Sequence, residues 1–210
     1  MIRALLADDH RLVREGLKQL LSEAPGIVVA AEAANSQEVM EKVRTEEIDV
    51  VLLDISMPGR SGLEVLKELK RIRPNLPVLM VTMYPEKEYA VRALKTGAAG
   101  YLTKSCAPDE LITAVRRVTS GGRYVSPSVA EVLAVELQEG VEKPRHELLS
   151  NRELQVMLMI ARGKTVGEIA VDMCLSAKTV STYRTRILDK LKLSNNAEIA
   201  RYAIKEGLVE

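Results

Sequence analysis

The sequence predicts an α/β domain built on a five-stranded, doubly wound parallel sheet, followed by a smaller all-α domain of four helices. Short apolar runs alternate with amphipathic stretches five times in residues 1–122, and strands apolar on both faces need helices on both sides of the sheet. Residues 148–210 show helical periodicity only. A chain of 210 residues is long enough for two such domains.

Five strand–helix units are expected in the first domain. The predicted strands lie at 2–7, 27–34, 50–53, 78–82 and 99–102, and the predicted helices at 10–24, 36–44, 62–73, 86–96 and 108–120. Ser36 is expected to cap the helix that follows it, and Pro74 to end the helix before it. The first domain then closes at Gly121-Gly122.

Residues 123–147 are predicted to be an interdomain linker that contains one helix, at 127–138. The rest of this linker is polar and is interrupted by glycine and proline. The second domain, 148–210, has predicted helices at 151–162, 166–173, 178–191 and 197–206. Ser176 is expected to cap the third of these helices.

Composition excludes several classes of protein. The two cysteines are far apart, which predicts reduced thiols and neither a disulfide framework nor a zinc site. No apolar run reaches the length of a membrane span, and the apolar start of the chain ends at Asp8, so we expect no signal peptide, no membrane partner and a cytoplasmic location. The second domain is mildly basic, which permits nucleic-acid binding.

Three carboxylates follow predicted strands. Asp8 and Asp9 come after the first strand, and Asp54 ends the third. In a doubly wound sheet the carboxyl ends of these strands lie side by side, which is where ligands bind. Like charges a few ångströms apart repel, and Mg²⁺, which prefers oxygen ligands, would relieve that repulsion.

Two more polar side chains are expected at the same edge of the sheet. Thr82 ends the fourth strand and Lys104 follows the fifth. With a metal ion they would hold phosphoryl oxygens, while the central Asp54 acts as the nucleophile. A single aspartate at a strand end is most often a cap or turn residue, so the prediction depends on the joint pattern.

These residues resemble a known family. The first domain is similar to the receiver domain of response regulators, which has a flavodoxin-like fold, in the segments Asp8-Asp9-His10, 53–59, Thr82 and 97–104. The resemblance implies that Asp54 is phosphorylated by a sensor histidine kinase and that the protein is not an enzyme beyond its own phosphorylation and dephosphorylation. It also implies that Mg²⁺ is held by Asp9, Asp54 and the backbone carbonyl of Ser56, with Asp8 acting mainly through water.

The same resemblance assigns a switch. Thr82 and Lys104 would contact the phosphoryl group, and Tyr101 would be the aromatic residue that follows Thr82 when it moves inward. For Tyr101, the alternative from the sequence alone is a half-buried strand residue. Phosphorylation, a local change of charge, would thus favour one of two arrangements of Thr82 and Tyr101.

The predicted helix at 178–191 has one polar face. Val180, Ile187 and Leu191 lie on its apolar side, at about 100° per residue. The opposite side carries hydroxyl and cationic side chains, which suit a helix in a major groove. The solvated face of a small helical bundle would have a similar composition. The candidate DNA-binding residues are Lys178, Thr179, Ser181, Thr182, Thr185, Arg186 and Lys190.

The second domain resembles the LuxR-type helix-turn-helix domain. The segments that carry the resemblance are 149–154, 160–163, 168–170 and 175–180, and Glu153 would be its structural acid. Tyr183 replaces a common histidine, and Asn151 also departs from the usual residue, which leaves base preference open. A receiver followed by this domain is the NarL/FixJ arrangement, which implies promoter DNA as a partner, a homodimer in the active state and RNA polymerase as a further candidate partner.

Two other functions are compatible with parts of the sequence. A haloacid-dehalogenase-like phosphohydrolase also uses an aspartate nucleophile, but it expects a second aspartate where this chain has Ser56. A signalling protein whose helix-turn-helix binds only protein is the other alternative. The cationic residues at 178, 184, 186 and 190 favour DNA binding over this alternative.

Overall fold

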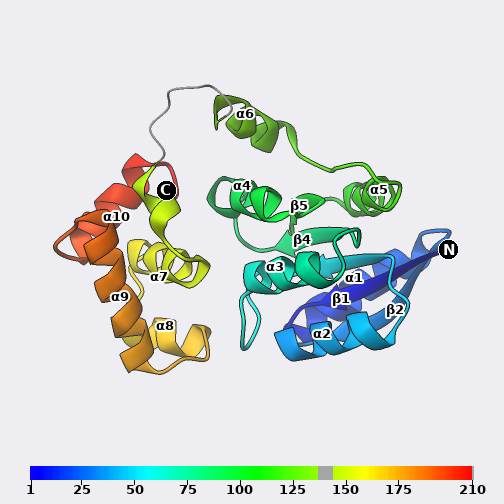
Figure 1. Cartoon of the computed structure of the whole chain (residues 1–210), viewed down its shortest axis with the longest axis horizontal. Helices are drawn as coiled ribbons and strands as arrows, with labels where there is room; N and C mark the ends of the chain where they lie inside the picture. The colour runs from blue at the N-terminus through cyan, green and yellow to red at the C-terminus, as the bar shows by residue number, and fades with distance from the viewer. Residues whose placement is uncertain (137–143, 210) are drawn as a thin grey trace. The chain divides into compact units, whose positions relative to one another are not determined.

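The computed structural model describes residues 1–136 and 144–209, which form two compact units within residues 1–137 and 138–210 (Figure 1). Each unit has its own core. The polar part of the predicted linker at 137–143, and the end of the helix expected to reach Gln138, lie outside the described residues.

The first unit is built on an all-parallel sheet in the order β2-β1-β3-β4-β5, which confirms the predicted doubly wound topology. β1 lies centrally and pairs with β3 from Ala4 opposite Val50 to Ala7 opposite Leu53, so these two strands end side by side. The strands are β1 Ile2–Ala7, β2 Ile27–Ala33, β3 Val50–Leu53, β4 Val78–Thr82 and β5 Gly100–Thr103.

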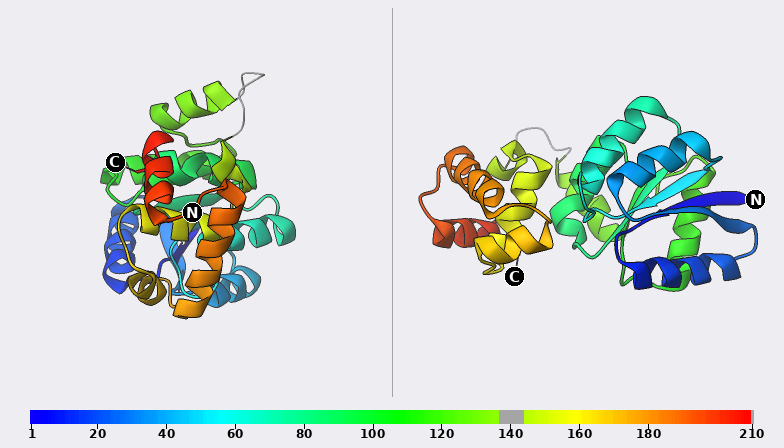
Figure 2. Two further views of the ribbon diagram at one scale, coloured as in Figure 1. Left: turned by 90° about the vertical axis from the view of Figure 1, so that its left-hand side faces the viewer. Right: turned by 90° about the horizontal axis from the view of Figure 1, so that it is seen from below.

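Helices cover both faces of this sheet (Figure 2). Alternate strand residues such as Leu6 and Leu52 pack with α1 and α5 in one apolar cluster, while Leu5 and Leu53, also buried, lie on the other face of the pleat. The helices of this unit are α1 Arg11–Glu23, α2 Ser36–Thr45, α3 Gly62–Ile72, α4 Glu86–Thr96, α5 Pro108–Thr119 and α6 Pro127–Glu136.

The start of α2 differs from the prediction that Ser36 caps it, and that prediction is wrong. Asn35 has an extended backbone, and its side-chain oxygen accepts the N–H groups of Gln37 and Glu38 at 3.1 and 3.0 Å. Ser36 is already helical, so its hydroxyl is free for another role and accepts the N–H of Arg60 at 3.1 Å. Ser36 therefore braces the loop between β3 and α3.

The segment after α5 remains attached to the first unit. Tyr124 forms a parallel bridge with Gly100 of β5, and its hydroxyl donates to Glu110 of α5 at 2.9 Å. The Ser126 hydroxyl donates to Glu86, the first residue of α4, at 2.7 Å, and α6 lies against α4 with Val129 buried (Figure 1). This compact unit thus continues through the helix of the predicted linker.

The second unit contains the four predicted helices and a short 3-10 turn. Reciprocal capping bonds begin two of them, between Ser150 and Glu153 and between Thr165 and Glu168. No helix of the described residues in either unit is long and apolar enough to cross a bilayer. The elements are η1 Arg145–Leu148, α7 Asn151–Ala161, α8 Val166–Asp172, α9 Ala177–Leu191 and α10 Asn196–Lys205.

Candidate functional site

Charged side chains meet at the carboxyl edge of the sheet, as expected. The ammonium of Lys104, just after β5, lies 2.6 Å from Asp8 Oδ2 and 2.7 Å from Asp54 Oδ2. All three side chains are almost completely buried, with 6, 3 and 3% exposed. One lysine thus bridges the carboxylates that follow β1 and β3.

The charge on Asp54 is costly in this setting. Burial raises the pKa of Asp54, while Lys104 and a hydrogen bond from the Thr82 hydroxyl oppose that rise. Burial lowers the pKa of Lys104, but the carboxylates of Asp54 and Asp8 outweigh it and the net direction is upward. One oxygen of Asp54, Oδ1, is buried and has no hydrogen-bond partner. The site therefore holds a buried carboxylate oxygen that a cation or a hydrogen-bond donor would stabilise.

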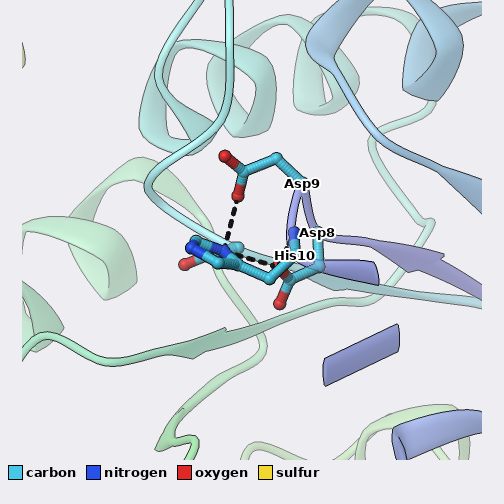
Figure 3. A group of neighbouring side chains, drawn as sticks. Asp8, Asp9 and His10 are labelled. Carbon is cyan, nitrogen blue, oxygen red and sulfur yellow. Dashed lines mark hydrogen bonds and ion pairs between the residues drawn. The ribbon is translucent and has the colours of Figure 1, made fainter. Parts of the chain in front are cut away.

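The carboxylates fit a metal ion. One ligand atom from each of Asp8, Asp9, His10 and Asp54 lies within 4.8 Å of the others. Figure 3 shows the first three: the His10 ring lies between the two carboxylates, with Nδ1 2.8 Å from Asp9 Oδ1 and 3.3 Å from Asp8 Oδ1. Oxygen donors of this kind suit Mg²⁺. Ser56 lies two residues beyond Asp54, half-buried in the loop that leads to α3.

The backbone around Asp54 is held by a close approach to the start of α3. The N–H of Gly62 donates to the carbonyl of Ile55 at 2.8 Å. A Cβ at Gly62 would come within 1.9 Å of the Asp54 carbonyl oxygen, so only glycine fits there without a backbone shift. The sequence pattern predicts Gly62 only as the start of a helix and carries no sign of this close approach.

Thr82 and Tyr101 are both completely buried. Thr82 ends β4 beside Asp54, whereas Tyr101 on β5 donates its hydroxyl to the carbonyl of Tyr84 at 2.9 Å. The Tyr84 ring in turn contacts Tyr89 of α4, with ring centroids 4.8 Å apart. Sequence reasoning missed Tyr84 and Tyr89, whose positions in a loop and on a helix carried no pattern.

The outward face of α9 is as the periodicity predicted. Val180, Ile187 and Leu191 are buried, and Ser176 caps the helix by accepting the N–H of Thr179 at 3.1 Å. Thr179 is half-buried, with its hydroxyl on Ser176. The exposed candidate residues are Lys178, Ser181, Thr182, Thr185, Arg186 and Lys190.

Lys190 differs from the other exposed residues of α9. Its ammonium lies 2.6 Å from Glu153 Oε2 and 3.2 Å from the carbonyl of Leu148. Glu153 is 3% exposed; burial raises its pKa, but Lys190 and the N–H of Ser150 outweigh this and hold it below its usual value. Lys190 therefore ties α9 to the start of α7.

Comparison with known proteins agrees with both units. A family model described as the response regulator receiver domain matches residues 4–116, and one described as bacterial regulatory proteins, luxR family, matches residues 147–203. Response regulator GacA of Pseudomonas viridiflava is 42% identical over 211 residues, covering 100% of this chain and 99% of that protein. Response regulator UvrY of Escherichia coli K12 is 41% identical, covering 99% of this chain and 96% of that protein.

A solved structure covers the same two domains. RcsB from Salmonella enterica serovar Typhimurium, bound to promoter rprA in the presence of phosphomimetic BeF3−, is 25% identical with a TM-score of 0.66. It covers 96% of this chain and 98% of its own. The chain belongs to the NarL/FixJ family of two-component response regulators, which join a receiver domain to a luxR-type DNA-binding domain.

Proposed function

We propose that Asp54 is the phosphoacceptor of this response regulator and that a sensor histidine kinase phosphorylates it in a Mg²⁺-dependent reaction. The observation that carries the proposal is the buried carboxylate of Asp54, whose Oδ1 has no hydrogen-bond partner while Lys104 and Thr82 lie beside it. Such a carboxylate is costly unless it binds a cation or reacts.

Each side chain at the site has a separate role in phosphoryl transfer. An oxygen of Asp54 attacks the phosphorus of a phosphohistidine, the P–N bond breaks, and its electron pair leaves with the imidazole as the P–O bond forms. Lys104, released from Asp54, pairs with a phosphoryl oxygen, and the Thr82 hydroxyl donates to another. Asp9, Asp54 and the Ser56 carbonyl would hold Mg²⁺, with Asp8 acting through water. When bound, the ion neutralises charge on the carboxylates and the phosphoryl oxygens.

Phosphorylation of Asp54 affects the rest of the domain through residues of β4 and β5. Thr82 turns toward the phosphoryl group, and Tyr101 moves into the space that Thr82 leaves. The Tyr101 hydroxyl bonds the carbonyl of Tyr84, whose ring contacts α4, so a shift of Tyr101 is passed on to α4. Phosphorylation thereby changes the surface formed by α4, β5 and α5.

The second unit binds promoter DNA through α9 in this proposal. Lys178 and Arg186 hold phosphates, while Thr179, Ser181, Thr182 and Thr185 face the base edges. The exposed hydroxyls and cations on one face of α9, and the promoter-bound relative, support this assignment. We place the active protein in the cytoplasm as a homodimer on DNA, where RNA polymerase is a further candidate partner.

The first experiment labels the full chain with acetyl phosphate and Mg²⁺ and locates the phosphoryl group by mass spectrometry. Wild type is expected to carry it on Asp54, and Asp54→Asn is expected to carry none. Asp49→Asn, which alters a carboxylate paired with Arg3, is the matched control and is expected to label normally. Persistent labelling of Asp54→Asn would overturn the assignment.

The second experiment measures binding to promoter DNA by fluorescence anisotropy, with and without phosphorylation. Lys178→Ala and Arg186→Ala are each expected to reduce the slope of log affinity against log salt by about one, because each removes one phosphate contact. If neither form of wild type binds any promoter fragment better than unrelated DNA, the proposed function is wrong.

A further inference from the structure

The imidazole of His10 belongs to the group of potential ligand atoms at the carboxyl edge of the sheet. His10 caps α1 from an extended backbone, yet its side chain makes no capping bond. Instead the ring turns back toward Asp8 and Asp9, as Figure 3 shows. The side chain is 62% exposed, so burial does not force this position.

Lys104 and His10 contact different oxygens of the carboxylates. Lys104 occupies Oδ2 of both Asp8 and Asp54. His10 lies by Oδ1 of Asp8, which also accepts the His10 backbone N–H at 2.9 Å, and by Oδ1 of Asp9. Asp54 is 3% exposed, and its Oδ1 has no partner. This buried, unpartnered oxygen is an independent sign that a ligand binds here.

The spacing suits coordination of one ion. Ligands about 2.1 Å from an octahedral ion lie about 3.0 Å apart when adjacent and about 4.2 Å apart when opposite. The ligand atoms of Asp8, Asp9, His10 and Asp54 all fall within 4.8 Å of one another, and the shortest approach of His10 Nδ1 to an oxygen is 2.8 Å. His10 Nδ1 therefore lies among the candidate oxygen ligands, and a small rearrangement would bring all four atoms around one ion.

We propose that His10 supplies a nitrogen ligand to the divalent-cation site, so that the site favours a first-row transition ion such as Zn²⁺ or Co²⁺ over Mg²⁺ more strongly than its carboxylates alone would. Mg²⁺ prefers oxygen, whereas Zn²⁺ and Co²⁺ bind imidazole well. This deepens the proposed function and rests on it, because the same carboxylates serve both. The competing account makes His10 a counter-ion that leaves when any metal enters.

The test measures Co²⁺ and Mg²⁺ binding to the full chain by titration calorimetry at one fixed, mildly alkaline pH. His10→Ala is expected to weaken Co²⁺ binding about tenfold, the loss of about 1.4 kcal/mol, and Mg²⁺ binding by less than about twofold. Any oxygen site favours Co²⁺ over Mg²⁺ to some degree, so the quantity compared between wild type and variant is the ratio of Co²⁺ affinity to Mg²⁺ affinity. The only other histidine, His146, gives the matched control His146→Ala, expected to keep the wild-type ratio.

A second measurement reads the ring itself. Histidine-selective NMR of the wild-type chain is expected to show a strongly paramagnetically shifted His10 ring on Co²⁺ addition, with the His146 ring unchanged. An unchanged ratio in His10→Ala, or tighter binding of both ions, overturns the proposal; the latter result identifies a counter-ion. Absence of phosphoryl label on Asp54 in the wild-type chain would instead overturn the proposed function, so the two failures are distinguishable.

Discussion

Lys190 tests which exposed residues of α9 stabilise the second unit and which contact DNA. The periodicity of α9 placed Lys190 among the DNA-binding candidates, whereas its ammonium contacts Glu153 and the Leu148 carbonyl. We predict that Lys190→Ala destabilises the second unit without removing a phosphate contact. Lys178→Ala, on the same helix, should do the reverse.

The magnitude follows from the burial of the two partners. Removing one member of a fully buried ion pair costs about 3–5 kcal/mol, and an exposed pair contributes about 1 kcal/mol or less. The Glu153 side chain is 3% exposed and that of Lys190 is 40% exposed, so solvent screens only one side of the contact. We therefore expect a loss of about 2 kcal/mol in the free energy of unfolding of this unit, between those two limits.

The assay is hydrogen exchange of the α7 and α9 amides in the full chain, combined with the salt dependence of DNA affinity. Lys190→Ala should speed exchange of the slowest amides about 30-fold, which corresponds to the predicted 2 kcal/mol. Its slope of log affinity against log salt should equal that of wild type, whereas Lys178→Ala should lower the slope by about one and leave exchange unchanged.

The reasoning would be refuted by the opposite pattern. If Lys190→Ala lowers the salt slope by one and exchanges like wild type, the ammonium contacts phosphate and its bond to Glu153 contributes nothing measurable.

Three further predictions concern single side chains. Asp54→Asn should raise the stability of the first unit by about 1 kcal/mol near neutral pH, because burial raises the pKa of Asp54 and makes its charged form costly, while Lys104 keeps Asp8 as its ion-pair partner. This gain should shrink as the pH falls through the folded-state pKa of Asp54, which urea unfolding at several pH values will show. Gly62→Ala should lower that stability by about 3 kcal/mol in the same assay, since its Cβ would lie 1.9 Å from a backbone oxygen; an unchanged midpoint would contradict the close approach. Glu153→Gln should remove the loss of unfolding free energy that the second unit shows below about pH 4.5, because the pKa of Glu153 is held low in the folded state. A variant that loses stability with acid just as wild type does would disprove this.

The architecture could be predicted from sequence because each strand and helix has a strong local signal. The apolar run of β3, for example, ends in Asp54, and the parallel topology then brings Asp8 and Lys104 to it. The face of α9 was equally accessible, since Val180 and Ile187 repeat at helical spacing and are both buried.

Other features depend on tertiary contacts that no local pattern records. Asn35 and Ser36 are both good caps, and the contact of Ser36 with the β3–α3 loop decides between them. The exposed side of α9 includes Lys190 by periodicity alone, but the buried Glu153 that binds it lies 37 positions away. His10 stood in a recognised motif, yet only the fold shows its ring between two carboxylates.

The Tyr124 bridge has a consequence for handling the first unit in isolation. β5 is the last strand of the sheet, and the N–H of Tyr124 donates to the Ala99 carbonyl at 2.9 Å beside Gly100, covering part of an otherwise open edge. Open strand edges template pairing between molecules and lead to aggregation. A fragment that stops at Gly122 would bare this edge and the α4 surface under α6, whereas one that runs to Glu136 keeps both covered and should stay monomeric at higher concentration.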